Sequence, residues 1–186
     1  MEDDAMGDVF GYLALSLDGY IAGPGDDLSF LPAPEVDGED HGFAALLATV
    51  GCLLMGRRTF DVVMGFDGPW PYGDLPILVA TRRPLPALAP AAVRAAEGEI
   101  GALVRLAKEI AGEGRVYVDG GQVLGAALGA GLVDELTLTS VPVLLGGGAP
   151  LCPGLPAPVG LRLLAEDALH GGMIRRRYAV LRPEPA

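Results

Sequence analysis

Three short segments of this sequence combine residue types that bind phosphate groups. Each follows an apolar run that predicts a buried strand, and they are residues 56–59 (GRRT), 81–83 (TRR) and 120–123 (GGQV). Arginine binds phosphate oxygens in a bidentate manner, and a threonine hydroxyl donates to them. Glycines at a helix start expose backbone N–H groups where the helix dipole is positive. The three segments therefore indicate a ligand that carries several phosphates.

Each segment also has an ordinary structural explanation. Gly120 and Gly121 lie between an apolar run and a helical pattern, and such a turn can use glycine for backbone freedom alone. Arg57 and Arg58 begin a helix, where positive charge opposes the helix dipole. A bound anion would remove that cost, but both arginines can instead point into solvent or pair with carboxylates. The sequence has 13 basic residues against 24 acidic ones, so we favour the ligand for this basic pair.

The elements that must position these segments alternate between strands and helices. Strands are expected at 9–17, 52–55, 75–80, 93–95, 116–118, 136–145 with a break at Pro142, 161–165 and 174–181. Helices are expected at 40–48, 56–63, 100–110 and after Gly121. This order predicts an α/β fold with a mostly parallel mixed sheet that ends in an antiparallel hairpin. Ligands of such sheets bind at the carboxyl ends of the strands, where all three segments fall. We expect one domain over residues 9–182 and a flexible tail over 1–8.

Composition limits the classes of function. The chain has 186 residues, of which 51% are hydrophobic and 20% charged, as in a globular protein. A net charge of −11 argues against nucleic acid and anionic membranes as partners, but not against a small anion. Cys52 and Cys152 show no metal spacing and read as free thiols of a reducing compartment, which suggests a cytoplasmic protein without a metal. The apolar run 136–145 could pair across subunits, so a homodimer is expected.

Taken in order, the motifs resemble a known family. They are LSLDGYIAG (15–23), LLMGRRTF (53–60), LPILVATRRPL (75–85), VYVDGGQVL (116–124) and DELTLTSVPVLLGGGAPL (134–151). The chain is similar to the dihydrofolate reductase-like superfamily, and most similar to the reductase domain of the bifunctional riboflavin-biosynthesis deaminase-reductase. The resemblance implies a three-layer α/β/α fold and NADPH as cofactor. The zinc signature of the deaminase half is absent, so the resemblance is to a stand-alone reductase domain.

The resemblance also assigns roles to residues. Those expected at the cofactor are Gly56, Arg57, Arg58, Thr59, Thr81, Arg82, Arg83, Gly120, Gly121, Gln122 and Val123. Those expected near the nicotinamide and substrate are Ser16, Asp18 and Gly19. Asp18 and Asp40 are the candidate catalytic residues. Asp40 matches the spacing of the helix carboxylate that protonates the substrate in dihydrofolate reductases, although an N-cap role explains it equally well.

Two classes of function follow from the sequence. The first is an NADPH-dependent reductase that delivers hydride to a C=N or C=O carbon. The resemblance names 5-amino-6-(5-phosphoribosylamino)uracil as the substrate, with dihydrofolate or another pterin as the alternative. The second is a nucleotide-binding module that keeps the fold without catalysis, because no clear set of basic residues remains for a substrate phosphate.

Overall fold

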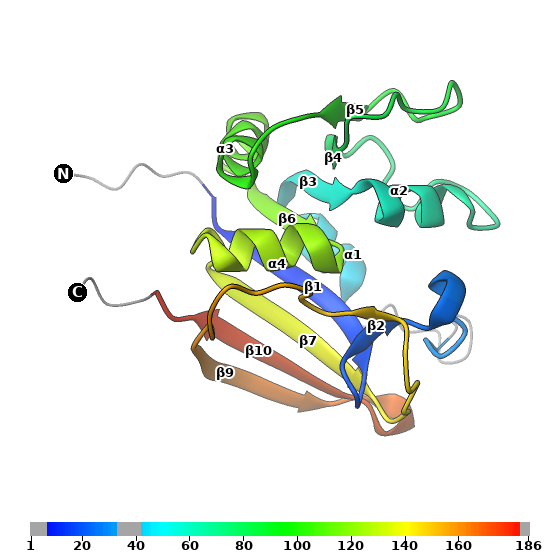
Figure 1. The fold of residues 1–186 in the computed structure, drawn as a ribbon, viewed down its shortest axis with the longest axis vertical. Helices are drawn as coiled ribbons and strands as arrows, with labels where there is room; N and C mark the ends of the chain where they lie inside the picture. The colour runs from blue at the N-terminus through cyan, green and yellow to red at the C-terminus, as the bar shows by residue number, and fades with distance from the viewer. Residues whose placement is uncertain (1–6, 33–41, 183–186) are drawn as a thin grey trace.

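One large sheet organises the protein. The computed structural model describes residues 7–32 and 42–182, whose large sheet contains β1 (Val9–Ser16), β3 (Val50–Gly56), β4 (Ile77–Ala80), β5 (Val93–Ala96), β6 (Arg115–Asp119), β7 (Glu135–Val141), β9 (Leu161–Ala168) and β10 (Ile174–Val180). The order is β5-β4-β3-β6-β1-β7-β10-β9 (Figure 1). Neighbours from β5 to β7 are parallel, and β10 and β9 follow as antiparallel strands. The predicted mixed sheet with a terminal antiparallel hairpin is confirmed.

Helices cover both faces of the sheet, as the three-layer prediction requires. They are α1 (Phe43–Leu47) and α2 (Arg57–Met64) on one face, and α3 (Ile100–Ala111) and α4 (Gly121–Gly129) on the other (Figure 1). Side chains alternate along each strand, so every buried strand contributes to two cores. In β6, for example, Val116 and Val118 pack with α3 and α4, while Tyr117 packs with Phe60 of α2. None of the helices in the described ranges is long and apolar enough to cross a bilayer.

The expected pairing of the run 136–145 across subunits is wrong, whereas its expected break at Pro142 is where β7 ends. The strand over residues 136–145 ends as β7 at Val141, because Pro142 has no N–H group to continue the ladder. Its neighbours are β1 on one edge and β10 on the other, so both rows of backbone groups are paired within the chain. β7 therefore has no free edge to offer a second subunit.

A second, small sheet was not predicted. It pairs β2 (Tyr20–Ala22) with β8 (Ala149–Pro150), which begins a segment of bends and turns over residues 149–156. This segment, which we call the strap, crosses in front of β1 and α4 (Figure 1). α4 meets the strap with three glycines four residues apart, which therefore share one helix face: Gly121, Gly125 and Gly129. A Cβ at Gly121 would lie 2.5 Å from the carbonyl oxygen of Pro150, so the two backbones are in direct contact.

A valine in this glycine face should force the strap away from the helix. A Cβ at Gly125 would lie 3.3 Å from the carbonyl oxygen of Pro153, and the valine methyl groups reach farther. Overpacking of this kind costs about 1–3 kcal/mol, so we expect Gly125→Val to lower the free energy of unfolding by that amount in urea denaturation. Gly147→Val is the control, because a Cβ there meets nothing within 4 Å. Equal denaturation midpoints for the two variants would contradict the packing argument.

Candidate functional site

The three candidate phosphate segments lie side by side in the structure. They follow β3, β4 and β6, and β3 is the central strand of the three. Gly56 at the end of β3 pairs with Ala80 of β4, and the preceding Met55 pairs with Asp119 of β6. The carboxyl ends of the three strands therefore form one edge from which all three segments emerge.

The glycine pair is packed directly against the start of α2. Gly120 has φ +90° and ψ 133°, a conformation that favours glycine, and a Cβ on it would collide with Oγ1 of Thr59. A Cβ on Gly56 would lie 3.3 Å from a methyl group of Val123 in α4. The first turns of α2 and α4 thus meet through glycines. Gln122, the second residue of α4, is exposed. The contact leaves both helix starts at the same strand edge.

The arginines of these segments all have partners. Arg57 is mostly buried and donates from Nε to Oδ1 of Asp61 at 2.7 Å. Its Nη1 donates to the carbonyl oxygens of Arg83 and Pro84, at 3.3 and 3.0 Å. Arg57 therefore braces the turn after β4, in which the Arg83 N–H donates to Thr81 Oγ1 at 3.0 Å.

The other arginines form ion pairs on the surface. Arg58 pairs with Asp26 at 2.6 Å, Arg82 with Glu97 at 3.0 Å, and Arg83 with Asp61 at 3.4 Å. This is the carboxylate pairing that the sequence left open for Arg57 and Arg58. Exposed pairs of this kind contribute little to stability, so the guanidinium groups are held near the edge without being locked there.

Asp18 ties the turn after β1 to the loop after β7. Its carboxylate accepts hydrogen bonds from the Ser16 hydroxyl at 2.6 Å, the Leu145 N–H at 3.1 Å and the Gly146 N–H at 2.7 Å. The Ser16 hydroxyl oxygen also accepts the N–H of Tyr20. These donors, Ser16 first, lower the pKa of Asp18 to about 2. The group is therefore ionised at neutral pH and suited to hold the two loops together.

The Asp18 contacts predict a defined pH dependence of stability. A carboxyl group whose pKa is lower in the folded state stabilises the fold above its unfolded pKa and loses this effect as the pH falls. We therefore expect wild type to exceed Asp18→Ala in unfolding free energy at pH 6, and the difference to shrink between about pH 4 and 2. Urea titrations across this range measure it. A constant difference across this range would argue against the hydrogen-bonded carboxylate, and Asp74→Ala, at an exposed position, is the control substitution.

The second candidate catalytic residue, Asp40, lies outside the described residues. Gly19, which was expected near the substrate, occupies the tight turn after β1 with φ +87°, and a Cβ there would meet nothing within 4 Å. Ser16 is almost fully buried. No group of His, Cys, Asp and Glu within residues 7–32 and 42–182 could hold a metal ion.

Sequence reasoning missed Asp119, the last residue of β6. Burial raises the pKa of its carboxyl group to about 6, although the N–H of Gly120 donates to Oδ1 at 2.8 Å and opposes the shift. Burial, and then the nearby Asp119 charge, also raises the pKa of the Tyr72 and Tyr117 phenols. The available signal was an acidic residue that ends an apolar strand and directly precedes two glycines. Perturbed carboxyl groups of this kind are characteristic of functional sites.

Asp119 lies where two central strands stop pairing. β1 and β6 share only the pairs Val9–Val116 and Phe10–Tyr117, although β1 continues to Ser16. β1 remains paired with β7 along this whole stretch. The carboxyl ends of β1 and β6 are therefore not joined by the ladder, and Ser16 and Asp119 end the strands on either side of this break.

The comparisons with known proteins decide the family. Residues 70–174, more than half of the chain, match the model of the RibD C-terminal domain. The chain belongs to the RibD C-terminal domain family. This match includes Asp119 and the glycine pair, whereas the arginines of α2 precede it. The chain is thus a riboflavin-biosynthesis-type reductase domain with the dihydrofolate reductase-like fold.

Individual relatives agree with this assignment. An uncharacterized protein of Bacillus subtilis, YwjB, is 30% identical over 153 residues, covering 82% of this chain and 86% of its own. The crystal structure of a putative riboflavin biosynthesis protein from Shewanella is 31% identical, with a TM-score of 0.83 over 94% of this chain and 99% of that one. Dihydrofolate reductase from Enterococcus faecalis, solved with NADP(H), shares the fold at 19% identity, with a TM-score of 0.65 over 94% and 97% of the two chains.

Proposed function

We propose that this RibD C-terminal domain is an NADPH-dependent reductase that transfers hydride to a C=N or C=O carbon. The observation that carries the proposal is the carboxyl group of the half-buried Asp119, whose pKa is raised to about 6, directly beside the glycine pair. A reductase of this class needs a cofactor cradle and a proton source within reach of each other. Asp119 is suited to be the proton source, and Gly120 and Gly121 are suited to form the cofactor cradle.

The residues at the strand edge fit a dinucleotide phosphate. The contact between Gly120 and Thr59 leaves backbone N–H groups at two helix starts, which suit a pyrophosphate. Arg58, Arg82 and Thr81 supply charge and a hydroxyl group for a 2′-phosphate. The nicotinamide would supply the hydride, and the protein orients it and excludes water.

Asp119 is suited to hold the proton that the reduced substrate requires. A carboxyl group with a pKa of about 6 is protonated in part of the molecules at neutral pH, unlike an ordinary aspartate. We propose that it protonates the substrate atom next to the carbon that receives hydride. In this scheme Asp18, which is ionised and bound by three donors, positions loops and does not donate a proton.

Replacement of Arg82 tests whether the protein recognises the 2′-phosphate, which NADPH has and NADH lacks. Its side chain is 85% exposed and pairs only with the exposed Glu97 among the described residues, so its removal should leave the fold intact. We expect Arg82→Ala to weaken NADPH binding about tenfold in fluorescence titration and to leave NADH affinity unchanged. Arg162→Ala on β9, remote from this edge, is the control. Equal losses for both cofactors would overturn the 2′-phosphate assignment.

Turnover assays decide the substrate. By family membership we propose 5-amino-6-(5-phosphoribosylamino)uracil, with dihydrofolate or another pterin as the alternative. NADPH oxidation should be measured with each compound in the presence of the purified protein. Tight NADPH binding without oxidation in any assay would favour a nucleotide-binding module without catalysis.

We also propose a cytoplasmic homodimer that associates through β9 in place of β7. β9 is one of the two edge strands of the large sheet, and Leu161, Leu163 and Leu164 on it are 40%, 52% and 39% exposed. An exposed apolar edge strand commonly pairs with another copy. Sedimentation velocity should give twice the mass of one 19.1 kDa chain at micromolar concentration, and a monomer at every concentration would contradict it.

A further inference from the structure

The turn after β2 is joined to the start of α2 by one ion pair. Residues 23–29, which we call the β2 turn, project from the end of β2 and form the blue coil below α2 in Figure 1. Nε of Arg58, the second residue of α2, lies 2.6 Å from Oδ1 of Asp26. Among the described residues, no other hydrogen bond or ion pair links the β2 turn to this helix. Asp26 therefore makes the polar contact that holds the β2 turn to the start of α2.

The β2 turn is closed on itself and has an unusual backbone conformation at Asp26. The N–H of Gly23 donates to the carbonyl oxygen of Asp27 at 2.7 Å, and the Asp27 carboxylate accepts the N–H and the hydroxyl of Ser29 at 2.9 and 3.0 Å. Asp26 has φ +64° and is the one non-glycine residue with positive φ in the described ranges. Aspartate is among the residues that tolerate this left-handed conformation. The compact turn thus presents the Asp26 carboxylate to Arg58.

A phosphate group can compete with Asp26 for this arginine. The side chain of Arg58 is 66% exposed and that of Asp26 is 30% exposed, so a ligand in solution can reach the pair. A phosphate monoester carries close to two negative charges at neutral pH, whereas a carboxylate carries one. It also accepts two parallel hydrogen bonds from a guanidinium. A carboxylate and a phosphate on one guanidinium would repel each other, so the phosphate should displace the carboxylate.

We propose that Asp26 is a displaceable counter-ion of Arg58, which holds the β2 turn against α2 until the 2′-phosphate of the cofactor takes its place. The inference rests on the proposed function, because NADPH is the ligand that supplies this phosphate. NADH lacks the phosphate and leaves the ion pair intact. β2 begins two residues after Asp18 and pairs with the strap at β8. Release of the β2 turn therefore connects phosphate binding at α2 with the turn that follows β1.

Asp26→Asn tests this exchange in the full chain. Asparagine keeps the shape of the side chain and also tolerates positive φ, but it removes the competing charge. An exposed ion pair holds its arginine with only a small preference, so we expect NADPH to bind about two- to fivefold more tightly in fluorescence titration. NADH affinity should stay unchanged. Asp27→Asn is the matched control, because it removes the same charge one residue away and Asp27 bonds to Ser29.

A double variant separates competition for Arg58 from a general change of charge. If Asp26 acts through Arg58, Asp26→Asn should leave NADPH affinity unchanged in a chain that already carries Arg58→Ala. An equal gain in Asp27→Asn, or a gain that persists without Arg58, would overturn the exchange. A loss of NADPH affinity in Asp26→Asn would also overturn it, because the carboxylate would then orient Arg58 toward the phosphate.

Hydrogen exchange gives a second measurement that needs no cofactor. In the free protein, the backbone amides of residues 23–29 should exchange faster in Asp26→Asn than in wild type, because the β2 turn loses its link to α2. Unchanged exchange would show that Asp26 does not hold the turn. Wild-type protein that binds no NADPH would reject the proposed function and the phosphate exchange together. It would not reject the hold of Asp26 on the β2 turn, which hydrogen exchange decides.

Discussion

Replacing Asp119 by asparagine should make the protein more stable at neutral pH and nearly inactive as a reductase. Burial raises the pKa of this carboxyl group from 3.8 to about 6. An acid whose pKa is higher in the folded state destabilises the fold wherever it must ionise, and the cost is absent below the unfolded pKa. A difference of about two pKa units corresponds to about 3 kcal/mol. Asparagine avoids this cost and still accepts the Gly120 N–H.

The pH dependence distinguishes this explanation from a general packing effect. The stability gain of Asp119→Asn should be fully present above about pH 6 and vanish as the pH falls to about 4. Loss of a general acid slows reactions by about 10²–10⁴-fold, so kcat should fall by that range with the accepted substrate. The wild-type rate should decline as the pH rises through about 6, and the variant should lack this decline.

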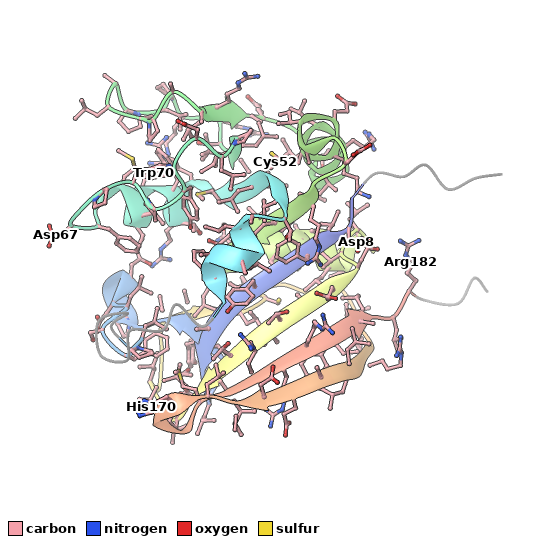
Figure 2. The ribbon with its side chains drawn as sticks, turned by 180° about the vertical axis from the view of Figure 1, so that it is seen from behind. Asp8, Cys52, Asp67, Trp70, His170 and Arg182 are labelled. Atoms are coloured by element: carbon pink, nitrogen blue, oxygen red, sulfur yellow. The ribbon has the colours of Figure 1, made fainter. Side chains whose placement is uncertain are left out.

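Asp67→Asn is the matched control for these measurements. Asp67 is exposed on the loop after α2 and points away from the protein (Figure 2). Its replacement removes the same charge and should change neither stability nor rate. An active Asp119→Asn enzyme with an unchanged pH profile would exclude Asp119 as the proton source.

Gly120→Ala should have the second largest effect, on both folding and cofactor affinity. At φ +90° an L-residue is strained by about 1–3 kcal/mol, and the added Cβ would overlap Thr59 Oγ1. Relief of that overlap must move the Thr59 side chain or separate the starts of α2 and α4. We expect a loss of about 2–4 kcal/mol in unfolding free energy and at least a tenfold loss in NADPH affinity.

Gly131→Ala separates backbone strain from the contact with Thr59. Gly131 also has positive φ, at +67°, but a Cβ there meets nothing within 4 Å. This control should lose only about 1–2 kcal/mol and keep its NADPH affinity. Equal affinities for the two variants would show that the Gly120–Thr59 contact does not shape the cofactor site.

The kind of sheet was predictable because its strands follow from local patterns. Apolar runs predicted β3, β4 and β6, but their order in the sheet, with β6 beside β3, was not predicted. That the three segments after these strands bind phosphate stays a prediction. The partners of Arg57 were not predictable, since the carbonyls of Arg83 and Pro84 reach it only through the folded turn. A charged residue in a sequence does not reveal which neighbour will neutralise it.

Asp119 was missed for a related reason. Only the three-dimensional environment shows that its carboxyl group is desolvated. Thr137 and Thr139 alternate with Leu136 and Leu138 in a pattern typical of any strand with one polar face. Their burial becomes visible only when β10 and β1 take their places on either side. The prediction that residues 136–145 pair across subunits was wrong for the same reason, because it did not foresee that β1 and β10 pair with both edges of β7.

The position of β1 in the sheet also determines when this strand can pair during synthesis of the chain. β1 comes first in the chain, yet both of its neighbours in the sheet come from the second half. The Val9 N–H donates to Asp134, 125 residues later, and Tyr117 donates to the carbonyl of Tyr12 across 105 residues. A ribosome must therefore release most of the sequence before the central strand is paired on either edge. During synthesis Phe10 and Tyr12 stay unprotected, so chaperones that bind apolar strands have their longest opportunity at the amino-terminal end.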